Sequence, residues 1–178
     1  AELVVTLPLV LPPTVIGYIL VILVGRNGFL GQMIFNALGT GIMFTWQAAV
    51  IAAYTVSLPL MVHTAKAAIE GVDREIEYAA YILGKSEFET AMQITIPLAK
   101  KGILAGLILS FARAIGEFGA TLMLAGNIPG KTNTMSISIY SAFQAGNNEL
   151  ANLLVLILVF MSLLTIALTG RFVGKLEV

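Results

Sequence analysis

The chain has 178 residues, of which 58% are hydrophobic and 11% charged, and ten Lys and Arg balance ten Asp and Glu. Soluble domains average about 25% charged residues, so this composition predicts a membrane protein, and the zero net charge excludes the basic surface that nucleic-acid binding requires. The lack of cysteine excludes disulfides, thiolate metal sites and thiol catalysis, and a single histidine, His63, leaves little for a histidine-based metal site.

Four segments contain the roughly 20 predominantly apolar residues that a helix needs to cross a membrane. We therefore expect a single all-α, polytopic membrane domain with four transmembrane helices. The first span begins near residue 1 without an initiator Met, so we expect the chain to start inside a longer protein, with one N-terminal helix missing. The predicted spans are Leu3–Val24, Phe44–Ala65, Gly102–Ala125 and Leu150–Gly170.

Prolines interrupt the first two spans. Each proline removes a backbone donor and clashes with the preceding turn, which predicts kinks or breaks at Pro8, Pro12, Pro13 and Pro59. Two interpretations stay open: ordinary proline use in membrane helices, or helices bent around a translocation pathway.

The loops after the first and third spans are short and carry helical patterns. Residues 29–38 place apolar side chains on one helical face between glycines, which predicts a small interfacial helix. The other loop opens with the turn sequence at residues 127–130, and a short helix or re-entrant segment is predicted over Met135–Gln144.

Between Asp73 and Pro97 the sequence changes to that of a soluble protein and predicts two short amphipathic helices. Asp73 is the expected N-cap of the first helix, and Gly84 its expected C′ residue. Ser86 and Glu89 form an expected capping box for the second, which Pro97 ends or bends into the third span. The two apolar stripes are Ile76, Ala79, Ala80 and Leu83, and Phe88, Ala91, Met92 and Thr95.

This helical hairpin has two possible roles: it ties two spans together, or it docks its apolar stripe into a groove of a soluble partner. The basic residues outside the spans are concentrated in its loop and in the C-terminal tail. Because Lys and Arg are retained on the cytoplasmic side, loop 66–101 and the C-terminus are predicted to be cytoplasmic. These residues are Lys66, Arg74, Lys85, Lys100, Lys101, Arg171 and Lys175, against Arg26 and Lys131 in the other two loops.

The third span carries Arg113 and Glu117, spaced to share one face of a helix. Ionisable side chains at membrane depth are costly and indicate function by default. Two roles are considered: a packing pair, or a pathway in which Arg113 attracts an anion and Glu117 is its partner or a gate. Gly116 and Gly119 permit the close approach of another helix.

The hairpin resembles the EAA loop of ABC importer permeases, written Glu-Ala-Ala-x3-Gly-x9-Ile-x-Leu-Pro. Tyr78-Ala79-Ala80, Gly84, Ile94 and Pro97 fit this pattern without a gap, although Tyr78 replaces the Glu and Glu77 lies one position earlier. Segments 7–18, 25–28, 70–73, 111–121 and 126–132 are similar to the oxyanion branch of that family, and to the molybdate permeases within it.

The resemblance implies a type I ABC importer permease fold, with one permease domain over residues 1–178 and a coupling loop at 70–99. It implies a homodimer in the plasma (inner) membrane of a prokaryote that imports molybdate or tungstate, with two cytoplasmic ATPase subunits and an external oxyanion-binding protein. The chain itself would be no enzyme and bind no cofactor, since ATP and Mg belong to the ATPase subunits. The resemblance assigns ATPase coupling to Glu77, Tyr78, Ala79, Ala80, Gly84, Ile94 and Pro97. It assigns the translocation pathway to Arg113, Glu117, Thr121, Pro12 and Pro13.

There are three alternatives to this function. A sulfate or thiosulfate ABC permease would share the same features. An ion-coupled secondary carrier or channel would use the same intramembrane charges but leaves the EAA-like loop without a purpose. An intramembrane enzyme is disfavoured because the spans contain no histidine–acid pairing or serine elbow, and the chain contains no phosphate-binding glycine-rich loop.

Overall fold

The computed structural model describes residues 2–174, and over that range it contains helices and loops without a β-strand. This confirms the all-helical fold. The helices are α1 (Glu2–Val10), α2 (Pro13–Val24), α3 (Phe29–Leu38), α4 (Trp46–Glu70), α5 (Arg74–Ile82), α6 (Glu87–Thr90), the π-helical turn η1 (Ala91–Thr95), α7 (Ile96–Ile115), α8 (Gly119–Ala125), α9 (Met135–Gln144) and α10 (Asn148–Gly174).

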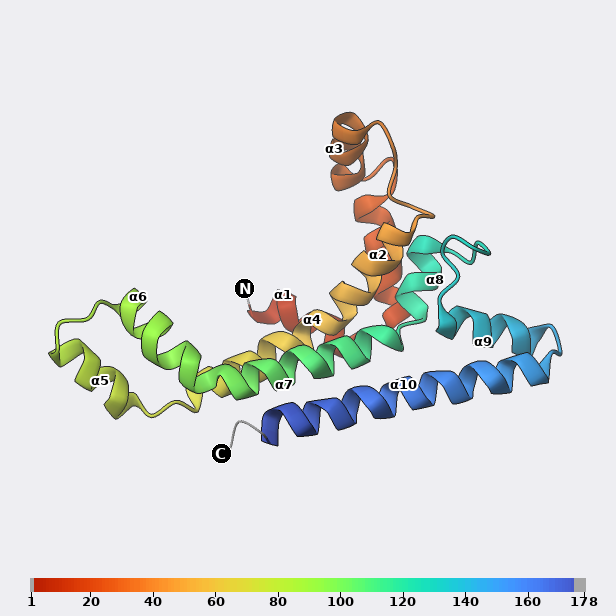
Figure 1. Cartoon of the computed structure of the whole chain (residues 1–178). Coiled ribbons are helices and arrows are strands. Elements are labelled where there is room, and N and C mark those ends of the chain that lie inside the picture. The colour runs from red at the N-terminus through yellow and green to blue at the C-terminus, as the bar shows by residue number, and fades with distance from the viewer. Residues whose placement is uncertain (1, 175–178) are drawn as a thin grey trace.

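The long helices α4 and α7 pack side by side, and α10 lies along α7 (Figure 1). The helices α2 and α8 pack against each other and against α4. Much of the core between them consists of alanine, whose small side chain lets helices approach closely. The core residues are Ile16, Leu20, Ala48, Ala52, Val56, Ala120, Leu124 and Ala125.

Three helical stretches of the described chain are long and apolar enough to cross a membrane: Trp46–Glu70, Glu87–Ile115 and Asn148–Ala167. They correspond to the second, third and fourth predicted spans. The helix pair Pro13–Val24 and Phe29–Ala37, bent by 52°, makes a fourth if it is counted as one span.

The first predicted span contains one of the breaks that its prolines predicted, at Pro12 and Pro13, while Pro8 lies inside the helix α1. The chain breaks at residues 11–12, between α1 and α2. Two successive prolines explain the break, because Pro13 disfavours helical geometry at Pro12 and then supplies the first residue of the next helix. Pro59, in contrast, lies inside the continuous helix α4, where it is buried.

The prediction that the third span is one continuous helix was wrong. Its helix begins earlier, at Glu87, and continues through η1 to Ile115, so Pro97 does not end it. The chain then breaks at residues 116–118 before α8 begins. The π-turn ends at Thr95, two residues before Pro97, and the Ile96 N–H bonds to the Ala91 carbonyl five residues earlier. In such a turn the backbone hydrogen bonds join residues five apart instead of four, and here it lies close to Pro97, which has no N–H to donate.

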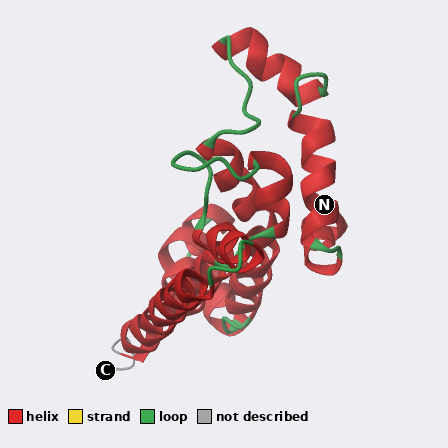
Figure 2. Ribbon diagram, turned by 90° about the vertical axis from the view of Figure 1, so that its right-hand side faces the viewer, coloured by secondary structure: helices red, strands yellow, loops and turns green. Residues whose placement is uncertain are grey.

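The molecule has two distinct ends. The hairpin of α5 and α6 lies at one end, and α3, the turn after α8 and α9 lie toward the other (Figure 1). The described end of α10 points toward the hairpin, while Lys175 falls outside the described residues. Figure 2 shows the long helices foreshortened, with loops joining them at their ends. The bounds of α3 and α9 confirm the short helices predicted in the two connecting loops.

Candidate functional site

The two breaks in the helices meet at one place, which we call the junction (residues 11–13 and 116–119). Gly119, the first residue of α8, lies against the start of α2. A Cβ atom at Gly119 would come within 3.2 Å of Pro13 Cβ and of Thr14 Cγ2. A larger residue at position 119 would therefore push these neighbours apart by a few tenths of an ångström, and the starts of two helices far apart in sequence lie next to each other.

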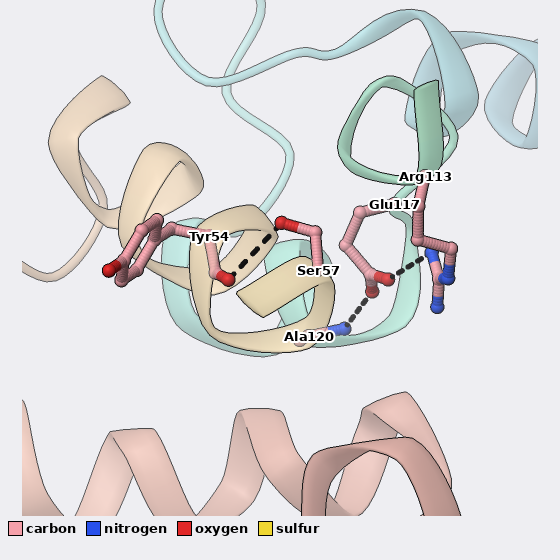
Figure 3. A network of polar contacts seen from close by, with 5 residues as sticks. All are labelled: Tyr54, Ser57, Arg113, Glu117 and Ala120. Carbon is pink, nitrogen blue, oxygen red and sulfur yellow. Dashed lines mark hydrogen bonds and ion pairs between the residues drawn. The ribbon is translucent and has the colours of Figure 1, made fainter. Parts of the chain in front are cut away.

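Glu117 occupies the break between α7 and α8, and its side chain is 2% exposed. One carboxylate oxygen, Oε2, accepts a hydrogen bond from Arg113 Nη1 at 3.0 Å (Figure 3). The other, Oε1, accepts from the backbone N–H of Ala120 at 2.9 Å. This bond satisfies one of the donors that the first turn of α8 leaves without a helical partner. Glu117 thus holds Arg113 and caps α8 at the same time.

Arg113 lies in the last turn of α7, where the helix dipole favours a cation. Its side chain is 39% exposed although its partner is buried. A guanidinium carries five N–H donors in a fixed fork, so the exposed part of this group can bind an anion while Nη1 stays on Glu117. The predicted Arg113–Glu117 contact exists, but Glu117 lies beyond the end of α7, so the two do not share a helical face.

A groove of about 490 Å³ lies between α4 and α7; Ala114 and Ile115 line it near the end of α7, and Arg113 is not among its lining residues. Ser57 Oγ donates to the Tyr54 carbonyl at 3.2 Å on one wall (Figure 3). On the other wall, the buried Ser110 Oγ has no hydrogen-bond partner among the described residues. Sequence patterns did not single out this groove, because its walls are ordinary apolar membrane helices.

The remaining predicted pathway residues differ in exposure. Thr121 is only 1% exposed and lies within α8. Pro12 is exposed and Pro13 half-buried at the junction. His63 forms a 3.0 Å hydrogen bond with Thr6 and so links α4 to α1.

The hairpin has the predicted local structure. Asp73 caps α5 by accepting from the Glu75 N–H at 2.9 Å. Gly84 follows the end of α5 with a left-handed φ of 83°, which explains the glycine. Ser86 and Glu89 form the capping box of α6 in both directions.

Only part of each predicted apolar stripe is buried. Ala80 and Thr95 face the interior of the hairpin, at 3% and 6% exposure. The hairpin tip, which we define as Ile82, Leu83 and Phe88, is 86%, 82% and 74% exposed. So much exposed apolar surface at one turn is typical of a docking site. Of the other predicted coupling residues, Tyr78, Ala79 and Pro97 are exposed and Ile94 is half-buried.

Glu77 points into the hairpin. Its Oε1 accepts a hydrogen bond from Thr95 Oγ1 at 2.5 Å, across 18 residues of sequence. The family resemblance assigned ATPase coupling to Glu77, and no feature of the pattern indicated Thr95 as its partner.

Residues 1–177 match the family model described as "Binding-protein-dependent transport system inner membrane component". The chain belongs to this family. As a permease, it is the translocating, membrane-embedded component of an ABC transporter.

Three relatives of this permease have names that include a substrate. YvgM of Bacillus subtilis (strain 168), a proposed molybdenum transport system permease protein, is 49% identical over 158 residues, which cover 89% of the chain and 70% of the relative. The molybdenum transport system permease protein ModB of Haemophilus influenzae is 42% identical over 167 residues, covering 93% and 73%. The sulfate transport system permease protein CysW of Synechococcus elongatus is 34% identical over 165 residues, covering 93% and 57%.

Proposed function

We propose that this chain is the membrane-spanning subunit of an ABC importer that carries molybdate into the cytoplasm. The observation that carries the proposal is the 49% and 42% identity to two permeases named for molybdenum transport, over most of the chain. Tungstate has the same tetrahedral shape and double negative charge as molybdate, so we expect it to be carried as well.

The working assembly contains two copies of this chain, two cytoplasmic ATPase subunits and an external oxyanion-binding protein. The apolar hairpin tip supports the ATPase contact, because its three large side chains are mostly exposed. The ATPase subunits bind ATP and Mg, and this chain binds neither. The exposed apolar face of α10 supports a membrane location, since only 6% of its apolar window is buried within the chain.

Closure of the ATPase subunits on ATP moves the two hairpins and, through them, the junction. The helical stretch Glu87–Ile115 supports this route, because it runs without a break from the hairpin to Arg113. Its 29 residues span about 44 Å. A rigid element of this length transmits a displacement at the hairpin to the place where both broken helices meet.

Arg113 is the proposed anion-binding group of the pathway. Its half-exposed guanidinium offers a positive charge and N–H donors, which together attract and bind a dianion. Glu117 is buried behind it and orients it. A dianion approaching from the exposed side meets Arg113 first.

Sulfate is the second candidate substrate, because the chain is 34% identical to a sulfate permease. Sulfate is also a tetrahedral dianion, so the same arginine serves either substrate. The external binding protein selects between them.

The test is uptake of radiolabelled molybdate into proteoliposomes that contain the permease, its ATPase subunits and the binding protein. We expect ATP-dependent uptake that tungstate inhibits more strongly than sulfate does. Arg113→Gln should lower the rate strongly, and the charge-retaining control Arg113→Lys should lower it less. Stronger inhibition by sulfate would reassign the substrate, and wild-type rates in Arg113→Gln and Glu117→Ala would remove the pair from the mechanism.

A further inference from the structure

The two arms of the hairpin are joined by one partly buried polar contact. Thr95 Oγ1 donates to Glu77 Oε1 at 2.5 Å, at the short end of the range for a hydroxyl bonded to a carboxylate. Thr95 is 6% exposed and Glu77 is half-buried, so water competes poorly for this bond. A second side-chain bond, from Lys85 in the turn to Gln93, is exposed.

Thr95 occupies a special place in the chain. It is the last residue of the π-turn η1 and directly precedes α7. A π-turn interrupts the regular bonding of a helix and often occurs at functional positions. The bond from Glu77 therefore attaches α5 to the point where the second arm of the hairpin passes into the long helix.

The direction of the Glu77 side chain decides what it can do. One oxygen of the Glu77 carboxylate accepts a hydrogen bond from the buried hydroxyl of Thr95, so it is engaged inside the hairpin, whereas Ile82, Leu83 and Phe88 are exposed at the tip. Its interaction is with its own chain.

We propose that Glu77 is a positioning residue that fixes α5 to α7 through Thr95, so that displacement of the hairpin by the ATPase is passed to the junction. This inference rests on the proposed function. Without the bond, α5 moves independently of α7, and ATP is hydrolysed with less transport. The hydroxyl of Thr95 matters here as a donor, and the volume of its side chain does not.

The hairpin contains a matched control. Thr90 is also a buried threonine of the same arm, 1% exposed, and its hydroxyl has no hydrogen-bond partner among the described residues. Thr95→Val removes the hydroxyl that donates to Glu77 at nearly constant shape, and Thr95→Ser keeps that hydroxyl. Thr90→Val removes a hydroxyl that makes no hydrogen bond among the described residues.

The first measurement uses the permease alone. Because the chain has no cysteine, Glu75→Cys on α5 and Lys100→Cys on α7, both exposed, take spin labels for a distance measurement in lipid nanodiscs. We expect a narrow distribution of distances between the two labels in the labelled protein without a further substitution, in Thr95→Ser and in Thr90→Val. We expect a broad distribution in Thr95→Val and Glu77→Leu. An unchanged distribution in both of the last two variants overturns the proposal.

The second measurement is molybdate transported per ATP hydrolysed in the reconstituted complex. We expect Thr95→Val to lower this ratio by about threefold or more, as loss of one net hydrogen bond implies, while Thr95→Ser and Thr90→Val keep the parental ratio. If Glu77→Leu loses ATPase binding while Thr95→Val keeps the parental ratio, Glu77 contacts the ATPase directly and the proposal is overturned. A parent complex without ATP-driven uptake refutes the proposed function, and the spin-label distances still decide whether Glu77 fixes α5.

Discussion

Replacement of Glu117 separates its two roles, as cap of α8 and as partner of Arg113. Glu117→Ala removes both oxygen acceptors, whereas Glu117→Gln retains one neutral carbonyl oxygen in nearly the same volume. The comparison is informative because the two bonds end on groups of very different exposure: Ala120 is fully buried, and the Arg113 side chain is 39% exposed.

The exposure of Ala120 and of Arg113 determines how much unfolding free energy each substitution costs. In Glu117→Ala the buried N–H of Ala120 loses its acceptor, which costs about 1–3 kcal/mol. The lost ion pair adds only about 0–1 kcal/mol, because the half-exposed Arg113 is partly rehydrated. The expected loss of unfolding free energy is therefore about 1–4 kcal/mol. In Glu117→Gln the amide oxygen keeps the bond to Ala120 and Arg113 turns to solvent, so the expected loss is about 1 kcal/mol or less.

The assay is unfolding in mixed micelles with increasing SDS, followed by helical circular dichroism. We expect a larger loss of unfolding free energy for Glu117→Ala than for Glu117→Gln. Equal losses would show that the charge, and not the cap, stabilises this break. A loss below about 0.5 kcal/mol in Glu117→Ala, the size of an ordinary surface substitution, would show that Glu117 does not stabilise the start of α8.

Three further predictions concern the packing of α2 and the hairpin. A methyl group at Gly17 would lie 2.7 Å from a side-chain carbon of α8, so Gly17→Ala should cost about 1–3 kcal/mol in the same unfolding assay. Gly41→Ala is the control, since open space surrounds Gly41, and an equal loss in both would contradict the packing argument. Ser86→Ala removes the capping box and should destabilise α6 by about 1 kcal/mol, measured as faster hydrogen exchange at the Glu89 amide; undiminished protection would count against the cap. Phe88→Ala should weaken binding of the ATPase subunit by about tenfold without changing unfolding, because Phe88 is 74% exposed; unchanged affinity would exclude the hairpin tip as the docking surface.

Local signals predicted the short elements well. The caps at Asp73 and Ser86, the left-handed Gly84 and the helix at Met135–Gln144 all depend on residues within a few positions of each other. Such features follow from capping and turn chemistry with little influence from the rest of the fold.

The breaks were predicted only in part. Hydropathy treats Leu3–Val24 and Gly102–Ala125 as continuous because it measures apolar content and not backbone geometry. The break at residues 116–118 depends on a tertiary fit, since Gly119 must pack against Pro13 while Glu117 bonds to the Ala120 N–H. At Pro59 the sequence predicted a kink or a break, but α4 continues through this buried proline as one helix.

The sequence identified several residues of the site, but it did not predict how their side chains are arranged. Charge at membrane depth correctly singled out Arg113 and Glu117 as a contacting pair. The direction of Glu77 could not be read from the sequence, because its partner Thr95 lies 18 residues away on a face that reads as an ordinary apolar stripe.

The central claim is that ATP drives oxyanion import through the hairpin, and a single substitution at Gly84 tests it most directly. Open space surrounds Gly84, so Gly84→Asp adds a charge beside the apolar tip without a steric clash, and Gly84→Ala reproduces the backbone strain at its positive φ without the charge. In proteoliposomes with the ATPase subunits and the binding protein, the account predicts molybdate uptake that requires ATP, falls to background in Gly84→Asp and largely persists in Gly84→Ala. Uptake driven by an ion gradient without ATPase subunits, and unchanged in Gly84→Asp, would contradict it.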